Sequence, residues 1–343
     1  MKKSVHSTIT SAAFACVIGI PGAISLATTE LPDTNISVLK GAYQRTYEDR
    51  FSDGFLFSTF SREVLNALNI SLFGQASPDV VVGANEWLFT GEEFEVLATS
   101  VDLAEELRVA KDALDKQGIT LVPVIVPDKA RVYEDKLPRN RGEALSARYQ
   151  KAQDILGAVG FPQIDLLEML QEGREQQPTF MRTDTHWSPF GARLTANRVA
   201  SDLLLTNTET NAFVTEETPN QTFEGDLMKF VDTGRFSEWV GISRERITLP
   251  VTRASESGGL GLFGDAEVGI VLVGTSFSAR PEFNFDGALK KATQMDVVNL
   301  SVEGQGPFKP MTEALESGAI ADIAPQLVIW EIPERYIQTW RSK

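Results

Sequence analysis

One aspartate–histidine pair is well suited to acid–base chemistry. The chain of 343 residues has two histidines. We expect His6 to be removed with an export signal, which leaves His186 as the one imidazole able to titrate near neutral pH. Asp184 precedes His186 by two residues, and residues i and i+2 of an extended segment point to the same side. The carboxylate can then orient the ring. A single histidine excludes a multi-histidine metal centre. We expect no metal and no cofactor at this site.

A serine that follows an apolar run is the candidate nucleophile. The run 271–273 stops at Gly274, and Ser276 comes two residues later. A buried strand followed by a tight turn holds a hydroxyl at the edge of a sheet. A serine hydroxyl is scarcely ionised at neutral pH, so it needs a base such as His186. These residues predict a catalytic triad of Ser276, His186 and Asp184.

Two other interpretations of these motifs stay open. Ser278 could be the nucleophile, although Ser276 lies nearer to the strand end. The Asp-x-His pair could instead be a structural feature beside Trp187, just as Gly-x-Ser after a strand is often only a turn. One distance distinguishes the predicted triad from these two interpretations. In a triad, the Ser276 hydroxyl and the His186 ring should lie within hydrogen-bond reach of about 3 Å.

The first 27 residues are typical of an export signal. A short positive start, Met1-Lys2-Lys3, precedes an apolar segment at 12–26 and small residues suited to cleavage. The segment is short for a membrane-spanning helix and is interrupted by Pro21-Gly22. We expect residues 1–27 to be a signal peptide, with an uncleaved signal anchor as the alternative, and the remainder to lie in the periplasm. Cleavage would also remove Cys16, the only cysteine, which would exclude disulfides from the mature chain.

Composition indicates a globular protein with a full core. Hydrophobic residues make up 42% of the chain and charged residues 23%, which is ordinary for a folded domain. The formal net charge of −15 disfavours a nucleic-acid partner, which requires a basic face. The same charge supplies no long-range attraction toward an anionic polymer.

The elements that must position the triad alternate between strands and helices. We expect strands at 80–82, 87–89, 119–126, 163–167, 269–273, 297–300 and 327–330. We expect helices at 43–48, 60–68, 101–117, 144–159, 188–204, 285–292 and 311–316. This alternation predicts an α/β fold with a parallel sheet sandwiched by helices, and Pro123 favours a place at the sheet edge. Residues 28–75 form a predicted helical lead-in, and residues 76–343 form the main domain with an irregular insertion at about 205–267.

Four stretches together resemble one family. They are Gly83-Ala84-Asn85-Glu86-Trp87-Leu88-Phe89, Val126-Pro127-Asp128-Lys129-Ala130-Arg131-Val132-Tyr133, Asp184-Thr185-His186-Trp187 and Gly274-Thr275-Ser276. The chain resembles the alginate O-acetyltransferase AlgJ/AlgX group of the SGNH hydrolase-like superfamily over about 80–340. The resemblance implies an SGNH hydrolase-like fold and the same triad. Its chain order of Asp, His and Ser is circularly permuted relative to ordinary SGNH esterases.

Oxyanion donors and substrate contacts are less clearly marked. The backbone N–H beside Ser276 is one candidate donor, and Gly304 or Gly306 resembles the SGNH glycine block. The usual asparagine block is not recognisable at 329–335, where Arg335 is a candidate replacement. A missing donor lowers the rate about 100-fold or more. The candidate substrate-binding residues are Arg182, Arg280, Lys129, Trp187 and Arg335. Packing beside the site is the favoured alternative for Trp187, and a solvated loop is the favoured alternative for Lys129.

The combined residues and resemblance favour an exported O-acetyltransferase that modifies an exopolysaccharide, alginate or a similar polymer, through an acetyl-serine. The resemblance implies a membrane partner of the MBOAT type that delivers acetyl groups, together with other polymer biosynthesis and export proteins. Two alternatives use the same residues. One is a carbohydrate acetylesterase, in which water attacks the acyl-enzyme. The other is a non-catalytic polysaccharide-binding assembly protein.

Overall fold

The structure, a computed structural model, divides the chain into two units. One unit comprises residues 1–73 and 232–241, and the other comprises residues 74–231 and 242–343. The structure describes residues 24–31, 43–44, 46–47, 50, 58–73, 79–96, 101–205, 212–231, 233–236, 240–255 and 268–337. Most of the predicted export signal and part of the predicted helix at 43–48 lie outside these residues.

The first unit contains the predicted helix at 60–68, which is confirmed as α3 (Ser58–Phe73). A short 3-10 turn, Gly234–Phe236, packs against α3. Among the described residues, α3 included, no helix has both the length and the apolar composition needed to cross a membrane.

A four-stranded parallel sheet is the centre of the second unit. Its strand order is β3 (Thr120–Val126), β10 (Leu327–Pro333), β8 (Val268–Val273) and β9 (Asp296–Asn299). The predicted strands at 119–126, 269–273, 297–300 and 327–330 are therefore confirmed. Pro123 lies in β3, which pairs only with β10 and forms the sheet edge. An edge strand tolerates proline because the missing N–H breaks no ladder bond on its free side.

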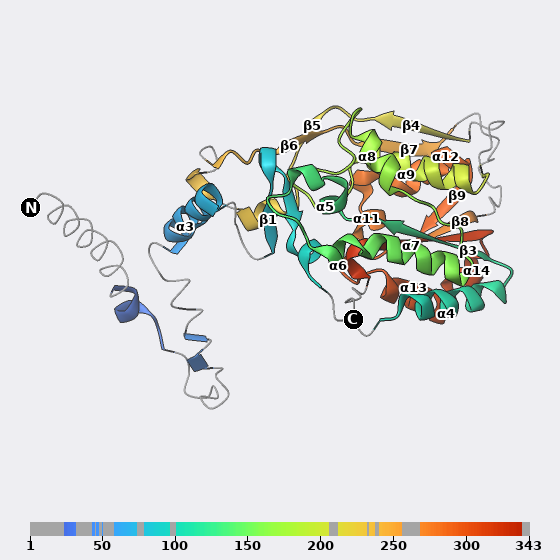
Figure 1. Ribbon diagram of the computed structural model, residues 1–343, viewed down its shortest axis with the longest axis horizontal. Helices are drawn as coiled ribbons and strands as arrows, with labels where there is room; N and C mark the ends of the chain where they lie inside the picture. The colour runs from blue at the N-terminus through green and yellow to red at the C-terminus, as the bar shows by residue number, and fades with distance from the viewer. Residues whose placement is uncertain are drawn as a thin grey trace, which may run out of the picture. The chain divides into compact units, whose positions relative to one another are not determined.

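Alternating apolar side chains give the sheet two buried faces, and helices lie on both sides of the sheet (Figure 1). In β3, Val122 and Val124 join the core on one face, while Leu121 and Ile125 join the core on the other. This follows from the two-residue period of a strand, and a sheet buried on both faces is expected for parallel strands. The helices on the first face are α8 (Leu167–Gly173), α9 (Pro189–Asp202) and α12 (Phe285–Thr293). The helices on the second face are α4 (Leu103–Asp115), α7 (Arg148–Val159), α13 (Phe308–Glu316) and α14 (Ala319–Ile323).

Local signals explain several helix boundaries. Asp102 accepts hydrogen bonds from the first backbone amides of α4, and Ser188 does the same for α9, which has Pro189 at its first position. Both are the side-chain caps that helix starts require. A positive-φ glycine, Gly160, ends α7 (φ 94°).

Two predicted elements differ from the structure. Residues 163–167 are not a strand, because side chains take the backbone donors that a strand ladder would use: Tyr149 accepts from Leu166 N (3.0 Å) and Asp165 accepts from Leu167 N (2.9 Å). The predicted helix at 144–159 is two helices, α6 (Glu143–Ser146) and α7, which meet at Ala147.

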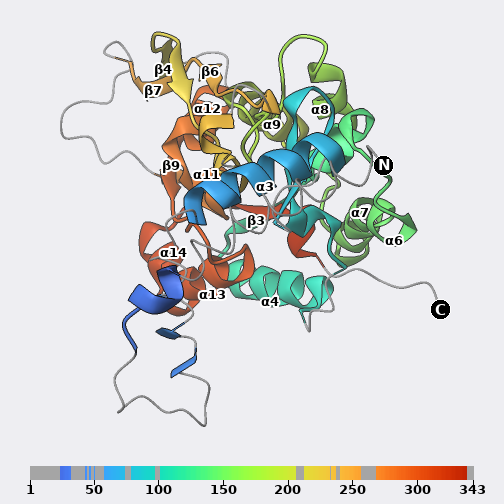
Figure 2. The same cartoon turned by 90° about the vertical axis from the view of Figure 1, so that its left-hand side faces the viewer.

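Outside the sheet lie a hairpin and the insertion. The predicted strands at 80–82 and 87–89 are confirmed as β1 (Val80–Val82) and β2 (Leu88–Thr90), which pair antiparallel as a hairpin. The insertion at about 205–267 contains two antiparallel pairs, β4 (Phe213–Glu217) with β7 (Pro250–Ala254), and β5 (Gln221–Phe223) with β6 (Glu245–Ile247). The pair β4–β7 packs against α12, beside which it is drawn in Figure 2. The insertion therefore covers the face that carries α9 and α12.

Candidate active site

The carboxyl end of β8 presents Ser276. The strand stops at Val273, and Thr275 caps α11 (Ser276–Ala279), whose first residue is Ser276. The Thr275 hydroxyl accepts from Phe277 N (3.3 Å). Phe277 and Ser278 are buried, whereas Ser276 is partly exposed. The turn thus holds one serine where a substrate can reach it and directs Ser278 into the protein.

A tight loop brings His186 to the same place. Phe180 and Trp187 form a β-bridge, and Met181 N donates to His186 O (3.0 Å). The indole N–H of Trp187 donates to the Phe277 carbonyl (3.1 Å), directly beside Ser276. The histidine loop and the serine turn are therefore joined by a buried hydrogen bond.

The three predicted catalytic side chains form one hydrogen-bonded chain. His186 Nε2 lies 2.7 Å from Ser276 Oγ, and His186 Nδ1 lies 2.6 Å from Asp184 Oδ1. An ionised carboxylate only accepts, so Nδ1 carries the proton and Nε2 is free to accept the proton of the serine hydroxyl. This arrangement can activate Ser276 for attack on an acyl carbon.

Asp184 is held in its ionised form. Burial by itself would raise the pKa of Asp184, but the hydrogen bond and charge of His186 hold that pKa well below its usual range. Backbone amides of His186 (3.0 Å) and Asp226 (2.8 Å) donate to the same carboxylate, and Arg280 Nη1 lies 3.5 Å from it. The carboxylate therefore keeps the charge that fixes the imidazole tautomer.

Aromatic rings fix the orientation of the imidazole. The buried Phe283 ring stacks on His186 with centroids 5.2 Å apart, and Phe277 meets it edge-on at 4.8 Å. His186 itself is only 3% exposed. The ring is therefore set by packing as well as by its two hydrogen bonds.

Asp226 is a site residue that sequence reasoning missed. It comes from the insertion, and its carboxylate accepts from Thr185 N (2.8 Å) and Thr185 Oγ1 (3.1 Å). Gly225 permits this close approach, since a Cβ there would collide with the Thr183 backbone. No spacing in the sequence links residues 225–226 to the histidine motif; the glycine before the aspartate was the only signal.

The side chains of Asp184, His186 and Asp226 could offer ligand atoms within 4.8 Å of one another. Two of these atoms, His186 Nδ1 and Asp184 Oδ1, already share a hydrogen bond of 2.6 Å. A metal ion there would have to displace the proton between them. The observed geometry is that of an oriented base.

Glu331 is a second residue that the sequence did not reveal. It lies fully buried on β10 and accepts from Thr275 N (2.7 Å), Thr275 Oγ1 (3.1 Å) and Ser278 Oγ (3.0 Å). Burial raises the pKa of Glu331 to about 7, opposed by these hydrogen bonds. A Cβ at Gly274 would collide with this carboxylate, so glycine is required there. Glu331 therefore supports the turn that carries Ser276.

Two of the predicted substrate contacts, Lys129 and Trp187, have fully buried and already bonded side chains. For Trp187 this is the packing beside the site that the sequence favoured, whereas Lys129 lies neither in a solvated loop nor at an open surface. The Lys129 ammonium donates to the carbonyls of Leu88, Arg182 (3.0 Å) and Asp184 (2.9 Å), which ties the histidine loop to β2. Burial lowers the pKa of Lys129 to about 8, opposed by nearby carboxylates. Trp187 is also fully buried and bonded, as described above. Both residues position the site and do not face a substrate.

The three arginines predicted to contact the substrate differ in whether their guanidinium groups are already engaged. Arg182 is bonded to Glu86 (2.6 Å) and to the Ser243 carbonyl (2.7 Å), so its guanidinium is engaged in holding loops together. Arg335 is 5% exposed and lies 3.0 Å from Glu92, with its Cζ 5.2 Å from the Phe277 ring. Arg280 is half-buried beside Asp184. Of the three, Arg280 is the one whose charge lies directly at the triad.

The segment after β9 runs beside the serine turn. Val302 N donates to Gly274 O (3.2 Å), which places the start of this segment next to the nucleophile turn. Gly304 and Gly306 both have positive φ, at 72° and 67°, a conformation that glycine adopts without strain. The donor roles of Gly304 and of the Ser276 amide, the first of α11, stay predictions.

Comparison with known proteins agrees with this geometry. The family described as "SGNH hydrolase-like domain, acetyltransferase AlgX" matches residues 80–334, which include the triad and the whole parallel sheet. The chain belongs to this family. Its fold is accordingly the expected SGNH hydrolase-like α/β fold, and the family's chemistry is acetyl transfer.

Relatives and solved structures of the AlgX family extend this result. The "Probable alginate O-acetylase AlgJ" of Pseudomonas syringae pv. tomato is 37% identical over 313 residues, covering 88% of this chain and 80% of that protein. The O-acetyltransferase domain of Pseudomonas putida AlgJ superposes with a TM-score of 0.67 at 34% identity, covering 75% of this chain and 91% of that domain. Pseudomonas aeruginosa AlgX superposes with a TM-score of 0.58 at 25% identity, covering 74% and 61%.

Proposed function

We propose that this protein transfers acetyl groups to hydroxyls of alginate through an acetyl-serine at Ser276. The observation that carries the proposal is the continuous chain from Asp184 through His186 to Ser276, with distances of 2.6 and 2.7 Å. Relatives that cover most of this chain are named alginate O-acetylases. The triad can carry out the acetyl transfer that the names of these relatives describe.

The first half-reaction loads the serine. Ser276 Oγ attacks the carbonyl carbon of an acetyl donor while His186 Nε2 takes the hydroxyl proton. The tetrahedral intermediate then collapses, and His186 returns that proton to the departing donor group. Acetyl-Ser276 and the deacetylated donor are the products.

The second half-reaction reverses these roles. A sugar hydroxyl gives its proton to His186 Nε2, and its oxygen attacks the acetyl carbon of acetyl-Ser276. Collapse releases the acetylated sugar, and Ser276 Oγ recovers the proton from His186. Asp184 stays ionised throughout and stabilises the imidazolium that forms in each half.

We also propose that the protein works in the periplasm and receives acetyl groups from a membrane protein of the MBOAT type. The motivation is the N-terminal sequence, with its basic start and apolar segment, together with the family resemblance. Cell fractionation tests the location, and site-specific crosslinking near Ser276 tests the donor. Recovery of the protein in the cytoplasm would contradict the proposal.

The acetylesterase is the second candidate, favoured by one observation: Ser276 is partly exposed, so water can approach an acyl group bound there. The two functions differ in the acceptor of the acetyl group. An activated acetyl ester and a mannuronate oligomer should be supplied together, and free acetate and acetylated oligomer measured separately. Transfer to the oligomer is expected; release of acetate alone would favour the esterase. A Ser276→Ala variant that still acetylates the oligomer would exclude both mechanisms.

A further inference from the structure

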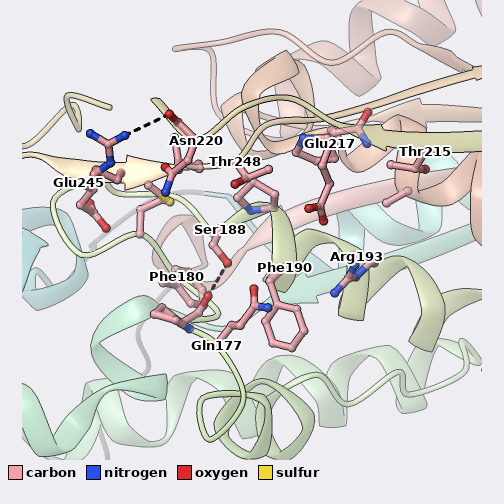
Figure 3. Close-up of a pocket in the computed structure, with 18 of the residues that line it drawn as sticks. Gln177, Phe180, Ser188, Phe190, Arg193, Thr215, Glu217, Asn220, Glu245 and Thr248 are labelled. Carbon is pink, nitrogen blue, oxygen red and sulfur yellow. Dashed lines mark hydrogen bonds between the residues drawn. The ribbon is translucent and has the colours of Figure 1, made fainter. Parts of the chain in front are cut away.

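A cavity lies beside the histidine loop, whose flanking residues Phe180 and Ser188 line it (Figure 3). Its volume is about 610 Å³, within the range of roughly 300–1,000 Å³ of small-molecule sites. Phe190 and Arg193 of α9 line one wall, and Thr215, Glu217 and Thr248 of the insertion line the facing wall. We call it the α9 cavity.

One layer of residues separates the α9 cavity from the triad. Met181 lines the cavity, and its backbone N–H donates to the His186 carbonyl. Asn284 also lines it and directly follows Phe283, which stacks on the imidazole. Neither Ser276 nor His186 belongs to the lining. The cavity is therefore next to the site described above and distinct from it.

The lining gathers positive charge on a chain that is strongly negative overall. Arg193, Arg246 and Lys291 face the cavity together with two carboxylates, Glu217 and Glu245. Glu245 is already engaged by the histidine loop, since it accepts from Arg182 N (2.8 Å) and from Thr183 N (2.6 Å). Three cations thus line the cavity with one carboxylate, Glu217, that no described residue engages, while the whole chain carries −15.

Most of the hydrogen-bonding capacity of these cations is not taken up by any described residue. Arg193 contacts the Phe190 ring at 5.3 Å and makes no hydrogen bond or ion pair with a described residue. Within the described part of the chain, Arg246 donates once, to Asn220 O (3.2 Å), and Lys291 once, to Phe213 O (3.0 Å). An arginine has five donors and a lysine three. The cavity therefore offers several charged donors to a ligand.

We propose that the α9 cavity binds an unacetylated stretch of a uronic-acid polysaccharide, away from Ser276. A uronate sugar carries one carboxylate and several hydroxyls. The cations of the cavity match the carboxylates, the amides of Gln177, Asn197 and Asn220 match the hydroxyls, and Glu217 accepts from hydroxyl groups. This inference rests on the proposed function, because the α9 cavity would be a second binding site for the polymer that is acetylated at Ser276.

Of the cations predicted from sequence to contact the substrate, Arg280 is the one whose charge lies directly at the triad. Lys129 is fully buried, and Arg182 is bonded to Glu86. A polysaccharide bound at the α9 cavity would stay attached to the protein after each acetyl transfer. This second contact raises the effective concentration of the polymer at Ser276. Polymer affinity and chemistry at Ser276 would then depend on different residues.

Binding is tested in the Ser276→Ala background, which separates it from turnover. An unacetylated mannuronate oligomer is titrated by calorimetry into full-length protein, with a neutral cello-oligosaccharide of the same length as the comparison ligand. Replacing both Arg193 and Lys291 by alanine is expected to weaken mannuronate binding about 10-fold or more, since charge-assisted hydrogen bonds are the stronger ones. Affinity should also fall with added salt.

Arg198→Ala is the matched control, because Arg198 lies on the same helix, does not line the cavity, and pairs with Asp202 (2.7 Å). It should bind like the parent. Unchanged binding in the Arg193/Lys291 double variant, equal binding of the neutral oligosaccharide, or no mannuronate binding at all would overturn the proposal. Acetyl transfer by protein with Ser276 intact to a small alcohol tests the proposed function separately, because it needs no polymer.

Discussion

The buried carboxylate of Glu331 should make the stability of the serine turn depend on pH. Its oxygens accept from Thr275 and Ser278, and no solvent reaches the side chain. Burial raises the pKa of Glu331 to about 7, from 4.5 for an exposed glutamate. The folded protein therefore keeps a proton that the unfolded chain releases.

The size of this effect follows from the shift. Stability from neutral Glu331 is fully present below about pH 4.5 and is lost as the pH rises to about 7, because the unfolded chain loses the proton first. One pKa unit corresponds to about 1.4 kcal/mol, so the loss is about 3 kcal/mol. Glutamine in place of Glu331 keeps the shape and an accepting oxygen for Thr275 but has no proton to release.

The test compares the free energies of unfolding of wild type and Glu331→Gln from pH 4.5 to 8, measured with urea. The variant's stability relative to wild type should rise by about 3 kcal/mol up to pH 7 and then stay level. The same change at the exposed Glu303 should give a flat difference. A flat difference for Glu331→Gln as well would refute the assignment of a buried, neutral carboxyl beneath the nucleophile turn.

Three further substitutions probe the supports of the triad. Asp184→Asn should lower kcat by about 10⁴-fold, the loss seen when a triad aspartate no longer fixes the tautomer; a loss below 10-fold in a steady-state ester assay would contradict this role. Lys129→Ala leaves three buried carbonyls without their donor. Each unsatisfied carbonyl costs about 1–3 kcal/mol, so the free energy of unfolding should fall by more than about 3 kcal/mol. An unchanged urea midpoint would show that the ammonium is dispensable. Gly274→Ala forces a Cβ toward the Glu331 carboxylate. This overpacking should lower the free energy of unfolding by about 1–3 kcal/mol and slow acylation at Ser276. A thermal unfolding scan checks the first effect, and the acylation rate checks the second.

Much of the fold was predictable because its signals are local. Apolar runs bounded by turns marked the four sheet strands, and Ser188-Pro189 marked the start of α9. The segment 163–167 was predicted wrongly because its apolar residues resemble a strand. The hydroxyl of Tyr149 accepts from the amide of Leu166, which is seventeen residues later in the chain. Such a contact has no local sequence signature.

The residues of the candidate site likewise fall into those with a local sequence signal and those placed only by the tertiary fold. Ser276, His186 and Asp184 could be named because their types and spacing carry the chemistry. Asp226 and Glu331 could not, since each reaches the site from a distant element and only the tertiary fold brings it there. For Lys129 the sequence allowed a substrate contact or, more readily, a solvated loop, and neither describes a side chain around which the chain folds three carbonyls.

The central claim, an acetyl group carried on Ser276, is tested most directly by trapping it. The protein is mixed with an activated acetyl ester, quenched with acid within the first turnover, digested and examined by fragment-resolved mass spectrometry. The account predicts one acetyl group on the Ser276 hydroxyl, absent from Ser276→Ala and strongly reduced in His186→Ala. Acetylation of Ser278 instead, or turnover of the ester with no acetyl group on Ser276, would contradict it.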